Sequence, residues 1–289
     1  MPTKIEKDEI SGQQTTGHEW DGIKELNTPL PKWWLYTFYA TIALSLVYFV
    51  LFPSIPLGKT YFGGTLGFSQ RTEVAAQLTA AAQAQAPFMQ RISAASIEEI
   101  RKNPELLSYA QIGGRIAFSN NCAQCHQAGG AGAKGYPNLA DDDWLWGGTL
   151  EEIHHSIAYG VRNANEKSRQ SAMPRFGVDK ILDAKQINDV TEYVLALGNR
   201  STDQAAAQRG AKVFAEQCVA CHGEKGTGNQ ELGSPNLVDA IWLYGGDKAA
   251  IAQTIYYARN GNMPAWGERL DPATVKMLAV YVHALGGGK

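Results

Sequence analysis

The sequence predicts a mainly α-helical protein with one transmembrane helix near its N-terminus and two similar helical domains after it. Two observations lead to this prediction. One is an uncharged, predominantly apolar run at 33–52, and the other is an internal repeat over 105–199 and 200–289. We therefore expect five segments: an N-terminal segment 1–32, the transmembrane helix 33–52, a linker 53–104, and the domains 105–199 and 200–289.

The run WWLYTFYATIALSLVYFVLF is long enough to cross a bilayer. At about 1.5 Å per residue its helix spans about 30 Å, the thickness of the hydrocarbon layer. Trp33, Trp34 and Tyr36 lie at one end, where aromatic side chains typically meet the interface. A cleaved signal peptide is the alternative. Because a long, mostly polar segment precedes the run and no Ala-x-Ala site follows promptly, a retained anchor is favoured.

The linker 53–104 begins with Pro53 and Pro56, which end the predicted span. Residues 72–86 are rich in alanine and glutamine, which favours helix, but they have little apolar pattern. We expect a solvated, helical or partly ordered spacer that stops at Pro87.

The two domains correspond to each other along their length. A repeat of roughly 90 residues is far longer than a solenoid period and indicates two tandem small domains. The matched pairs are Gly114 and Gly210, Phe118 and Phe214, Pro137 and Pro235, Trp144 and Trp242, Arg162 and Arg259, Asn163 and Asn260, Met173 and Met263, and Tyr193 and Tyr281.

The end of each domain carries apolar residues at helical spacing, followed by Gly198 or Gly286 as a stop signal. The glycine and phenylalanine before each cysteine motif are four residues apart. These residues, Gly114 with Phe118 and Gly210 with Phe214, suggest an N-terminal helix that packs on the terminal one. The apolar positions are Ile187, Val190, Val194 and Leu197, and Val275, Leu278, Val282 and Leu285.

Each domain contains one Cys-x-x-Cys-His motif, and together the motifs use all four cysteines. This spacing is the attachment signature of a c-type haem. One helical turn places both thiols at one porphyrin edge and turns the histidine under the iron. Zinc sites and thioredoxin-like motifs also use Cys-x-x-Cys, but they do not explain the histidine. We expect two covalent haems c on Cys122, Cys125, Cys218 and Cys221, with His126 and His222 as iron ligands.

Met173 and Met263 occupy matched positions, each followed by proline, before the last helix of its domain. A thioether is a soft ligand that raises the reduction potential of haem iron, so both are predicted as sixth ligands. A six-coordinate haem transfers electrons and does not readily bind oxygen, so no catalytic residue is expected. Unmatched methionines and histidines are not expected to ligate iron: Met89, Met277, His154, His155 and His283.

The net charge of −2 and the pI of about 6.3 disfavour a nucleic-acid partner. Asp141, Asp142 and Asp143 form an acidic patch that could guide a basic donor, although such loops are commonly just solvated. Basic residues flank both ends of the predicted span, so charge leaves its orientation open. Bacteria attach haem c outside the inner membrane, which puts the domains in the periplasm and 1–32 in the cytoplasm.

Residues 18–34, HEWDGIKELNTPLPKWW, resemble the N-terminal signature of the dihaem subunit (CcoP, subunit III) of cbb3-type cytochrome c oxidases. Both domains resemble class I cytochrome c, and the order of segments also matches. The resemblance implies a membrane-anchored electron carrier. It would accept electrons from a periplasmic cytochrome c and pass them to a monohaem cytochrome c subunit. The catalytic haem-copper subunit would then reduce oxygen to water and pump protons.

The same resemblance implies two ligand sets, each from one repeat: Cys122, Cys125, His126 and Met173, and Cys218, Cys221, His222 and Met263. It also suggests that residues 18–28 contact partner subunits. One alternative is a free-standing dihaem carrier for another respiratory enzyme. Another is a dihaem peroxidase, which the two Met-Pro pairs disfavour because a peroxidase needs an open iron site.

Overall fold

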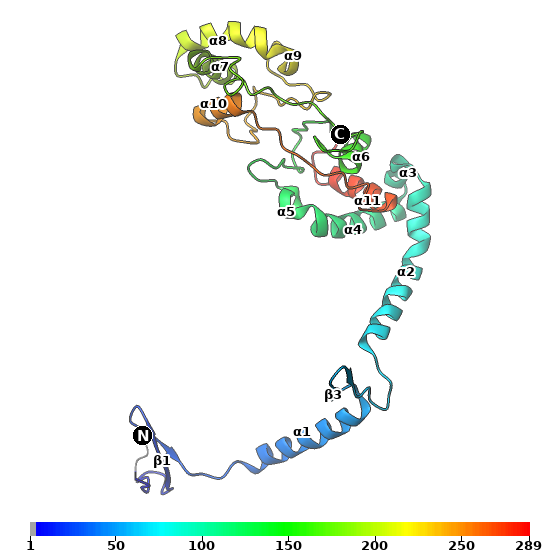
Figure 1. The fold of residues 1–289 in the computed structure, drawn as a ribbon, viewed down its shortest axis with the longest axis vertical. Helices are drawn as coiled ribbons and strands as arrows, with labels where there is room; N and C mark the ends of the chain where they lie inside the picture. Colours follow the sequence, from blue (N-terminus) through cyan, green and yellow to red (C-terminus); the bar gives the residue numbers. More distant parts are fainter. Residues whose placement is uncertain (1–3) are drawn as a thin grey trace. The chain divides into compact units, whose positions relative to one another are not determined.

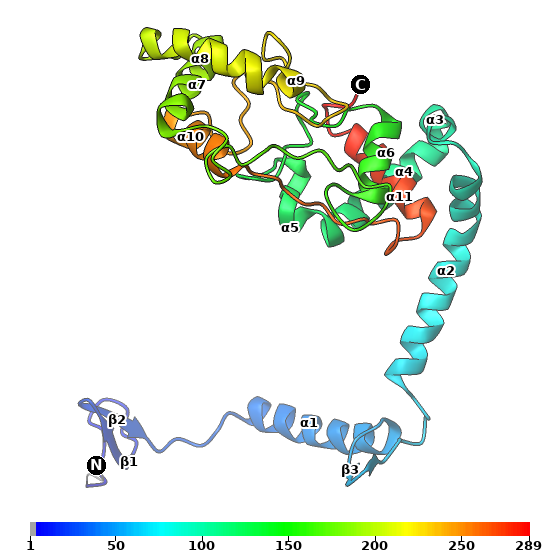
Figure 2. The same cartoon turned by 45° about the horizontal axis from the view of Figure 1, so that its top comes forward.

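A computed structural model describes residues 4–289, so residues 1–3 of the predicted segment 1–32 lie outside it. The chain divides into two compact units, one ending at Ala82 and the other Gln83–Lys289. Within the described residues the fold is mainly helical, as predicted, with two short hairpins in the smaller unit (Figures 1 and 2).

The smaller unit begins with an antiparallel hairpin of β1 (Thr15–Trp20) and β2 (Ile23–Leu26). Asp21 and Gly22 form its turn with φ angles of 48° and 82°, the left-handed pair that a tight hairpin needs. A second hairpin, β3 (Pro56–Leu57) with β4 (Thr60–Tyr61), follows the first helix.

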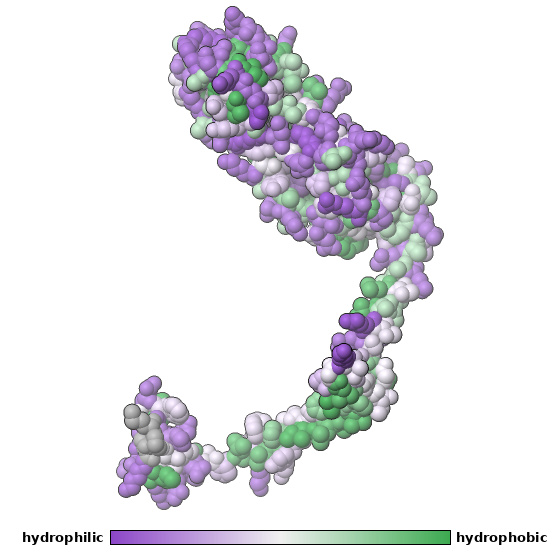
Figure 3. All heavy atoms as spheres, in the orientation of Figure 1, coloured by the Kyte–Doolittle hydropathy of each residue, from purple (hydrophilic) through white to green (hydrophobic). Residues whose placement is uncertain are grey.

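Helix α1 (Lys32–Leu51) coincides with the predicted membrane span to within a residue. None of its residues is buried, and hydrophobic side chains are exposed along its length (Figure 3). The hydroxyl groups of its threonines and its serine bond within the helix: Thr37 donates to the carbonyl of Trp33 at 2.9 Å, and Ser45 to that of Thr41 at 2.8 Å. The helix therefore suits a lipid environment, where every polar group must find an internal partner.

Helix α2 (Gln70–Ala94) contains Pro87, so the prediction that the helix stops at this proline is wrong. A short helix α3 (Ile97–Lys102) follows. Part of the segment after the proline is also buried, where a solvated spacer was expected. Ile92 and Ile100 are fully buried against α4 and α11, and Lys276 donates to the carbonyl of Ala95 at 2.7 Å. This burial and the capped helix end offset the hydrogen bond that proline removes.

The larger unit has two helical lobes (Figure 2). Lobe 1 contains α4, α5, α6 and α11, and lobe 2 contains α7, α8, α9 and α10. Their bounds are α4 Pro104–Asn121, α5 Ala123–His126, η1 Ala128–Gly130, α6 Leu150–Tyr159, α7 Ala184–Leu197, α8 Gln204–Gln217, α9 Val219–His222, α10 Lys248–Tyr257 and α11 Pro272–His283.

The lobes exchange their terminal helices. Helix α11, from the end of the second repeat, packs on α4 of the first repeat, and α7 packs on α8. The expected N-terminal to C-terminal helix pairs therefore form, but between repeats rather than within them. The connection from Leu197 to Gln204 is short, so α7 turns back directly onto α8 as an antiparallel neighbour.

Both helix pairs make the same contact. A Cβ atom on Gly114 would lie 2.3 Å from the carbonyl oxygen of Met277, so only glycine permits this approach. The ring centroids of Phe118 and Tyr281 are 5.4 Å apart, and those of Phe214 and Tyr193 are 5.0 Å apart. The glycine and aromatic contacts of the two helix pairs therefore correspond.

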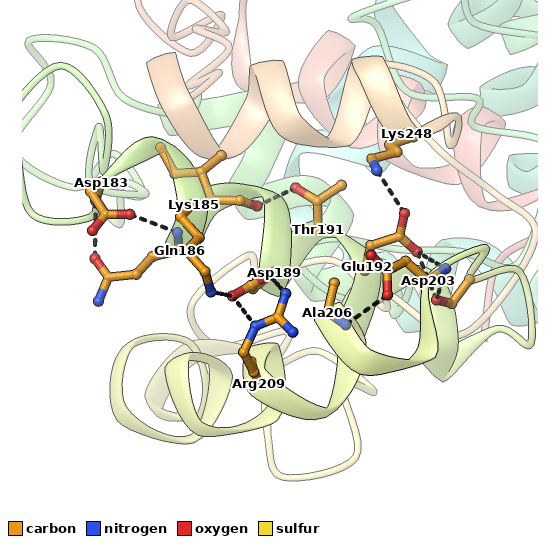
Figure 4. A network of polar contacts seen from close by, with 12 residues as sticks. Asp183, Lys185, Gln186, Asp189, Thr191, Glu192, Asp203, Ala206, Arg209 and Lys248 are labelled. Carbon is orange, nitrogen blue, oxygen red and sulfur yellow. Dashed lines mark hydrogen bonds and ion pairs between the residues drawn. The ribbon is translucent and has the colours of Figure 1, made fainter.

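The lobes differ in what covers each helix pair. In lobe 2 the fully buried Glu192 accepts hydrogen bonds from Ser201 at 2.7 Å and from the backbone N–H of Thr202 at 3.0 Å (Figure 4). Lys248 forms an ion pair with the same carboxylate at 2.7 Å. In lobe 1 the matched position is Val280, in the apolar cluster beneath α2 and α3.

We predict that Glu192→Gln destabilises the larger unit in a pH-dependent way. Burial alone would raise the pKa of Glu192, but hydrogen bonds from Lys248, Ser201 and backbone N–H groups lower it to about 2, below its ordinary value of 4.5. The stabilisation is therefore complete above pH 4.5 and is lost as pH falls toward 2. It amounts to on the order of 3 kcal/mol at pH 7.

Denaturant unfolding of parent and variant between pH 2 and pH 7 measures this difference. Glu216→Gln, at a carboxylate 56% exposed on α8, is the control and should change stability little at any pH. A Glu192→Gln deficit that stays constant with pH would contradict the argument.

Candidate haem sites

Each Cys-x-x-Cys-His motif lies at the turn that ends the N-terminal helix of its lobe. Cys122 caps α4, and the single turn of α5 carries Cys125 and His126. Cys218 caps α8, and α9 repeats the arrangement. All four thiols are free of disulfide bonds. The local helix thus holds both cysteines and the histidine at the spacing that covalent haem attachment requires.

The two histidines are held in the same orientation. The Nδ1 atom of His126 lies 3.0 Å from the carbonyl oxygen of Pro137, and that of His222 lies 3.0 Å from the carbonyl oxygen of Pro235. A proton on Nδ1 makes this hydrogen bond, which leaves the lone pair of Nε2 for a metal. The matched Pro-Asn-Leu segments therefore serve to fix the histidines.

Electrostatics also suit metal ligation. Burial lowers the pKa of His126 and of His222, although the hydrogen bond to proline acts in the opposite direction. Both imidazoles are therefore neutral near pH 7, as a ligand must be. Burial, with a smaller contribution from the second cysteine of each motif, raises the pKa of Cys122 and of Cys218 to about 11. Within the described residues no three His, Cys, Asp or Glu side chains gather as in a zinc site.

The two methionines lie in exchanged positions. Met263 packs in the core of lobe 1, in the cluster that includes Phe118 and Cys122. Met173 packs in the core of lobe 2, in the cluster that includes Phe214 and Cys218. Each methionine therefore shares a lobe with the cysteine motif of the other repeat, which differs from the expected grouping of His126 with Met173 and of His222 with Met263.

Reciprocal backbone contacts fix this exchange. Val161 and Met263 form an antiparallel bridge, with N–H to carbonyl distances of 3.0 and 2.9 Å. Asn163 donates to the carbonyl of Met263 at 2.8 Å. Asn260 accepts from the N–H of Met173 at 3.0 Å. A Cβ atom on Gly160 would lie 2.3 Å from the Met263 carbonyl oxygen, so this crossing requires glycine.

The histidines and methionines that were not expected to ligate iron make other contacts. His155 contacts the ring of Tyr159, and Nε2 of His283 lies 3.0 Å from the carbonyl of Lys289. Met277 is buried between helices.

Burial raises the pKa of Asp143, in the predicted acidic patch, to about 6, with further contributions from Asp239 and the neighbouring Asp residues. Sequence reasoning missed the roles of Asn163 and Asn260, although the Arg-Asn pair repeated in both domains was visible.

Each lobe combines two paired helices, a Cys-x-x-Cys-His turn with a fixed histidine, and a loop that carries Met263 or Met173, an arrangement typical of a cytochrome c. The sequence matches family models for the N-terminal domain of cytochrome oxidase-cbb3, FixP (residues 12–59), for cytochrome c (110–198), and for cytochrome c oxidase, cbb3-type, subunit III (205–282). The last two models follow the sequence repeats, whereas the lobes exchange their terminal helices.

Curated relatives match along essentially the whole chain. The chain is 55% identical to the cbb3-type cytochrome c oxidase subunit CcoP of Azospirillum brasilense, over 98% of this chain and 99% of the relative. It is 53% identical to subunit FixP of Azorhizobium caulinodans, over 98% and 96%. The chain therefore belongs to the CcoP/FixP family of cbb3-type oxidase subunits, as its N-terminal signature indicated. It is a cytochrome c subunit in the electron-transfer path to the oxidase core, and α1 accounts for membrane anchoring.

We predict that Asn163 and Asn260 each stabilise the methionine loop of the other repeat. The loops are 261–266, which contains Met263, and 171–176, which contains Met173. Asn260→Ala removes the acceptor of the Met173 N–H, so amide exchange in 171–176 should rise about tenfold, as expected for one lost hydrogen bond. Asn163→Ala should act on 261–266 instead. Hydrogen exchange read by mass spectrometry measures both peptides. An Asn260→Ala effect confined to 261–266 would refute the exchange.

Proposed function

We propose that the chain carries two haems c with exchanged methionine ligands. One haem is attached at Cys122 and Cys125 and is ligated by His126 and Met263. The other is attached at Cys218 and Cys221 and is ligated by His222 and Met173. The observation that carries this proposal is the location of each methionine in the lobe of the other cysteine motif. The ligating residues are those expected from the sequence, and only their grouping changes.

A haem with histidine and methionine ligands supplies a one-electron couple without an open coordination position. The residues of this chain hold that couple in place. Pro137 and Pro235 orient the histidines, and the apolar lobes surround the ligands. Two rigid, closed sites of this kind support electron transfer rather than substrate chemistry at this subunit.

The two lobes form one compact unit, which supports electron transfer between the sites. The backbone N–H of Gly135 donates to the carbonyl of Leu243 at 2.8 Å. The side chain of Gln230 donates to the carbonyl of Trp144 at 2.8 Å. Both contacts join the loop that follows one cysteine motif to the loop before α6 or α10 of the other repeat. We propose that this unit takes electrons from a soluble or membrane-bound donor cytochrome c.

The electrons then pass to a monohaem cytochrome c subunit and to the catalytic haem-copper subunit, which reduces oxygen and pumps protons. The names of the relatives, cbb3-type cytochrome c oxidase subunits, support partner subunits of such an oxidase. Helix α1 would cross the bacterial inner membrane, with 4–31 in the cytoplasm and the lobes in the periplasm. Covalent haem attachment outside that membrane supports this orientation. The hairpin of β1 and β2 would contact partner subunits.

The exchanged ligation is tested in chains that carry one haem. In Cys122→Ala/Cys125→Ala the remaining haem is attached at Cys218 and Cys221. We expect its methionine-to-ferric-iron charge-transfer band to persist when Met263→His is added and to disappear when Met173→His is added. Absorption spectra of the oxidised, full-length chain in detergent measure the band.

The reciprocal Cys218→Ala/Cys221→Ala chain should show the opposite dependence. Met89→Leu, at a partly buried methionine of α2 outside both sites, is the control and should leave the bands intact. Loss of the band with Met263→His in the first background would instead establish ligation within one repeat.

Membership of a complex is tested by mild purification through an N-terminal tag. The C-terminus is unsuitable, because the N–H of Lys289 bonds to the carbonyl of Gly148 at 2.9 Å and a tag would disturb lobe 1. We expect b-type haem bands beside the c-type bands, and oxygen uptake with a reduced cytochrome donor. A pure c-type spectrum, under conditions that keep other membrane complexes intact, would favour a free-standing carrier.

A further inference from the structure

Arg162 connects the two methionine loops. Its Nε atom donates to the carbonyl of Gly261 at 2.7 Å, and its Nη1 atom donates to the carbonyl of Ser171 at 2.8 Å. Gly261 and Ser171 each lie two residues before a methionine, Met263 and Met173. One planar guanidinium group therefore bonds to the backbone of both loops at once, which its fixed fork geometry allows.

The guanidinium of Arg162 is half-buried and packs over Trp146, with its carbon 5.8 Å from the ring centroid. Burial lowers the pKa of Arg162, and the opposing influence comes from Tyr244 rather than from a carboxylate. Carbonyl oxygens of the methionine loops thus take the place of a charged partner. Hydrogen bonds from a charged donor are the stronger kind, so this contact holds both loops firmly.

The matched residue Arg259 makes no such connection. Its Nη1 atom lies 3.4 Å from the carbonyl oxygen of Tyr244, and its Nη2 atom donates to Gln253. It lies over the ring of Tyr244, 5.0 Å from the centroid, as Arg162 lies over Trp146. The two arginines therefore share their aromatic contact and differ in their bonds to the methionine loops.

We propose that Arg162 is a positioning residue for both iron ligands, so that one side chain controls methionine ligation at both haems. The inference rests on the proposed ligation by Met173 and Met263 and adds a shared support for it. Loss of Arg162 should weaken both ligand bonds together, whereas loss of Arg259 should weaken neither.

The test uses the full-length, haem-loaded chain in detergent, in two backgrounds. Met173→His leaves Met263 as the remaining methionine ligand, and Met263→His leaves Met173, so the charge-transfer band reports one iron at a time. Added imidazole competes with that methionine for ferric iron. We expect Arg162→Gln to lower the imidazole concentration that displaces it by about tenfold in each background, because each loop loses one charge-assisted hydrogen bond.

Arg259→Gln removes the same charge at the matched position and should leave both titrations unchanged. Arg162→Lys keeps the charge but lacks the planar guanidinium that bonds to both loops. We therefore expect it to restore the parent imidazole titration at no more than one of the two irons. If Arg162→Gln does not accumulate, the imidazole titration is carried out with Arg162→Lys in its place. The proposal is overturned if only one background responds to Arg162→Gln, if Arg259→Gln has the same effect, or if lysine restores both irons.

Failure of the underlying ligation is distinguishable from these results. It would appear before any change at Arg162. The two backgrounds with Arg162 intact would lack a methionine band, or neither Met→His change would remove a band. With the parent bands present and assigned, the response to Arg162→Gln reports on the positioning role alone.

Discussion

The exchange of terminal helices between the two repeats is the constraint on which the rest of the larger unit depends. Helix α7 reaches α8 through a connection of a few residues, and this closes lobe 2 with the end of the first repeat. Helix α4 therefore pairs with the remaining terminal helix, α11, from the end of the chain. Each methionine loop precedes a terminal helix, so it is carried into the other lobe. Both candidate iron sites are therefore completed only when the lobes fold together.

The exchange of terminal helices also explains why different segments pack over the two helix pairs. The outer face of the α7–α8 pair is closed by its own connection, where Glu192 receives the N–H groups that begin α8. The α4–α11 pair has no such connection, because most of the chain lies between its helices. Its matching face is apolar, and the end of α2 and α3 cover it, with Lys276 bonded to the end of α2. The last part of the linker, the end of α2 with α3, thus becomes part of lobe 1, which an isolated cytochrome domain would not require.

Local features of the sequence predicted most of the fold and the candidate site residues. The membrane helix, the cysteine turns and the terminal helices follow from composition and spacing within one element. The exchange could not be predicted, because Gly114 with Tyr281 and Gly114 with Tyr193 would bury equivalent groups. The prediction at Pro87 failed for a similar reason. A proline is a local signal for a helix end, whereas the burial of Ile92, which favours continuing the helix, depends on tertiary contacts. The Arg-Asn pair is repeated in the sequence, but the contacts that it makes depend on which methionine loop packs against it.

A single additional residue accounts for the asymmetry between the two matched arginines. Two residues, Gly160 and Val161, separate the end of α6 from Arg162, whereas only Ala258 separates the end of α10 from Arg259. Val161 forms the bridge with Met263, and this extends the backbone past the end of α6 before Arg162 begins. Arg162 is thereby displaced from its own helix to the junction of the two loops, while Arg259 stays beside α10 and bonds to Gln253. A two-fold repeat with identical loops could not place one cation between both methionines. The additional residue breaks the symmetry at the point where the two loops meet, so one arginine bonds to both loops and the matched arginine bonds to neither.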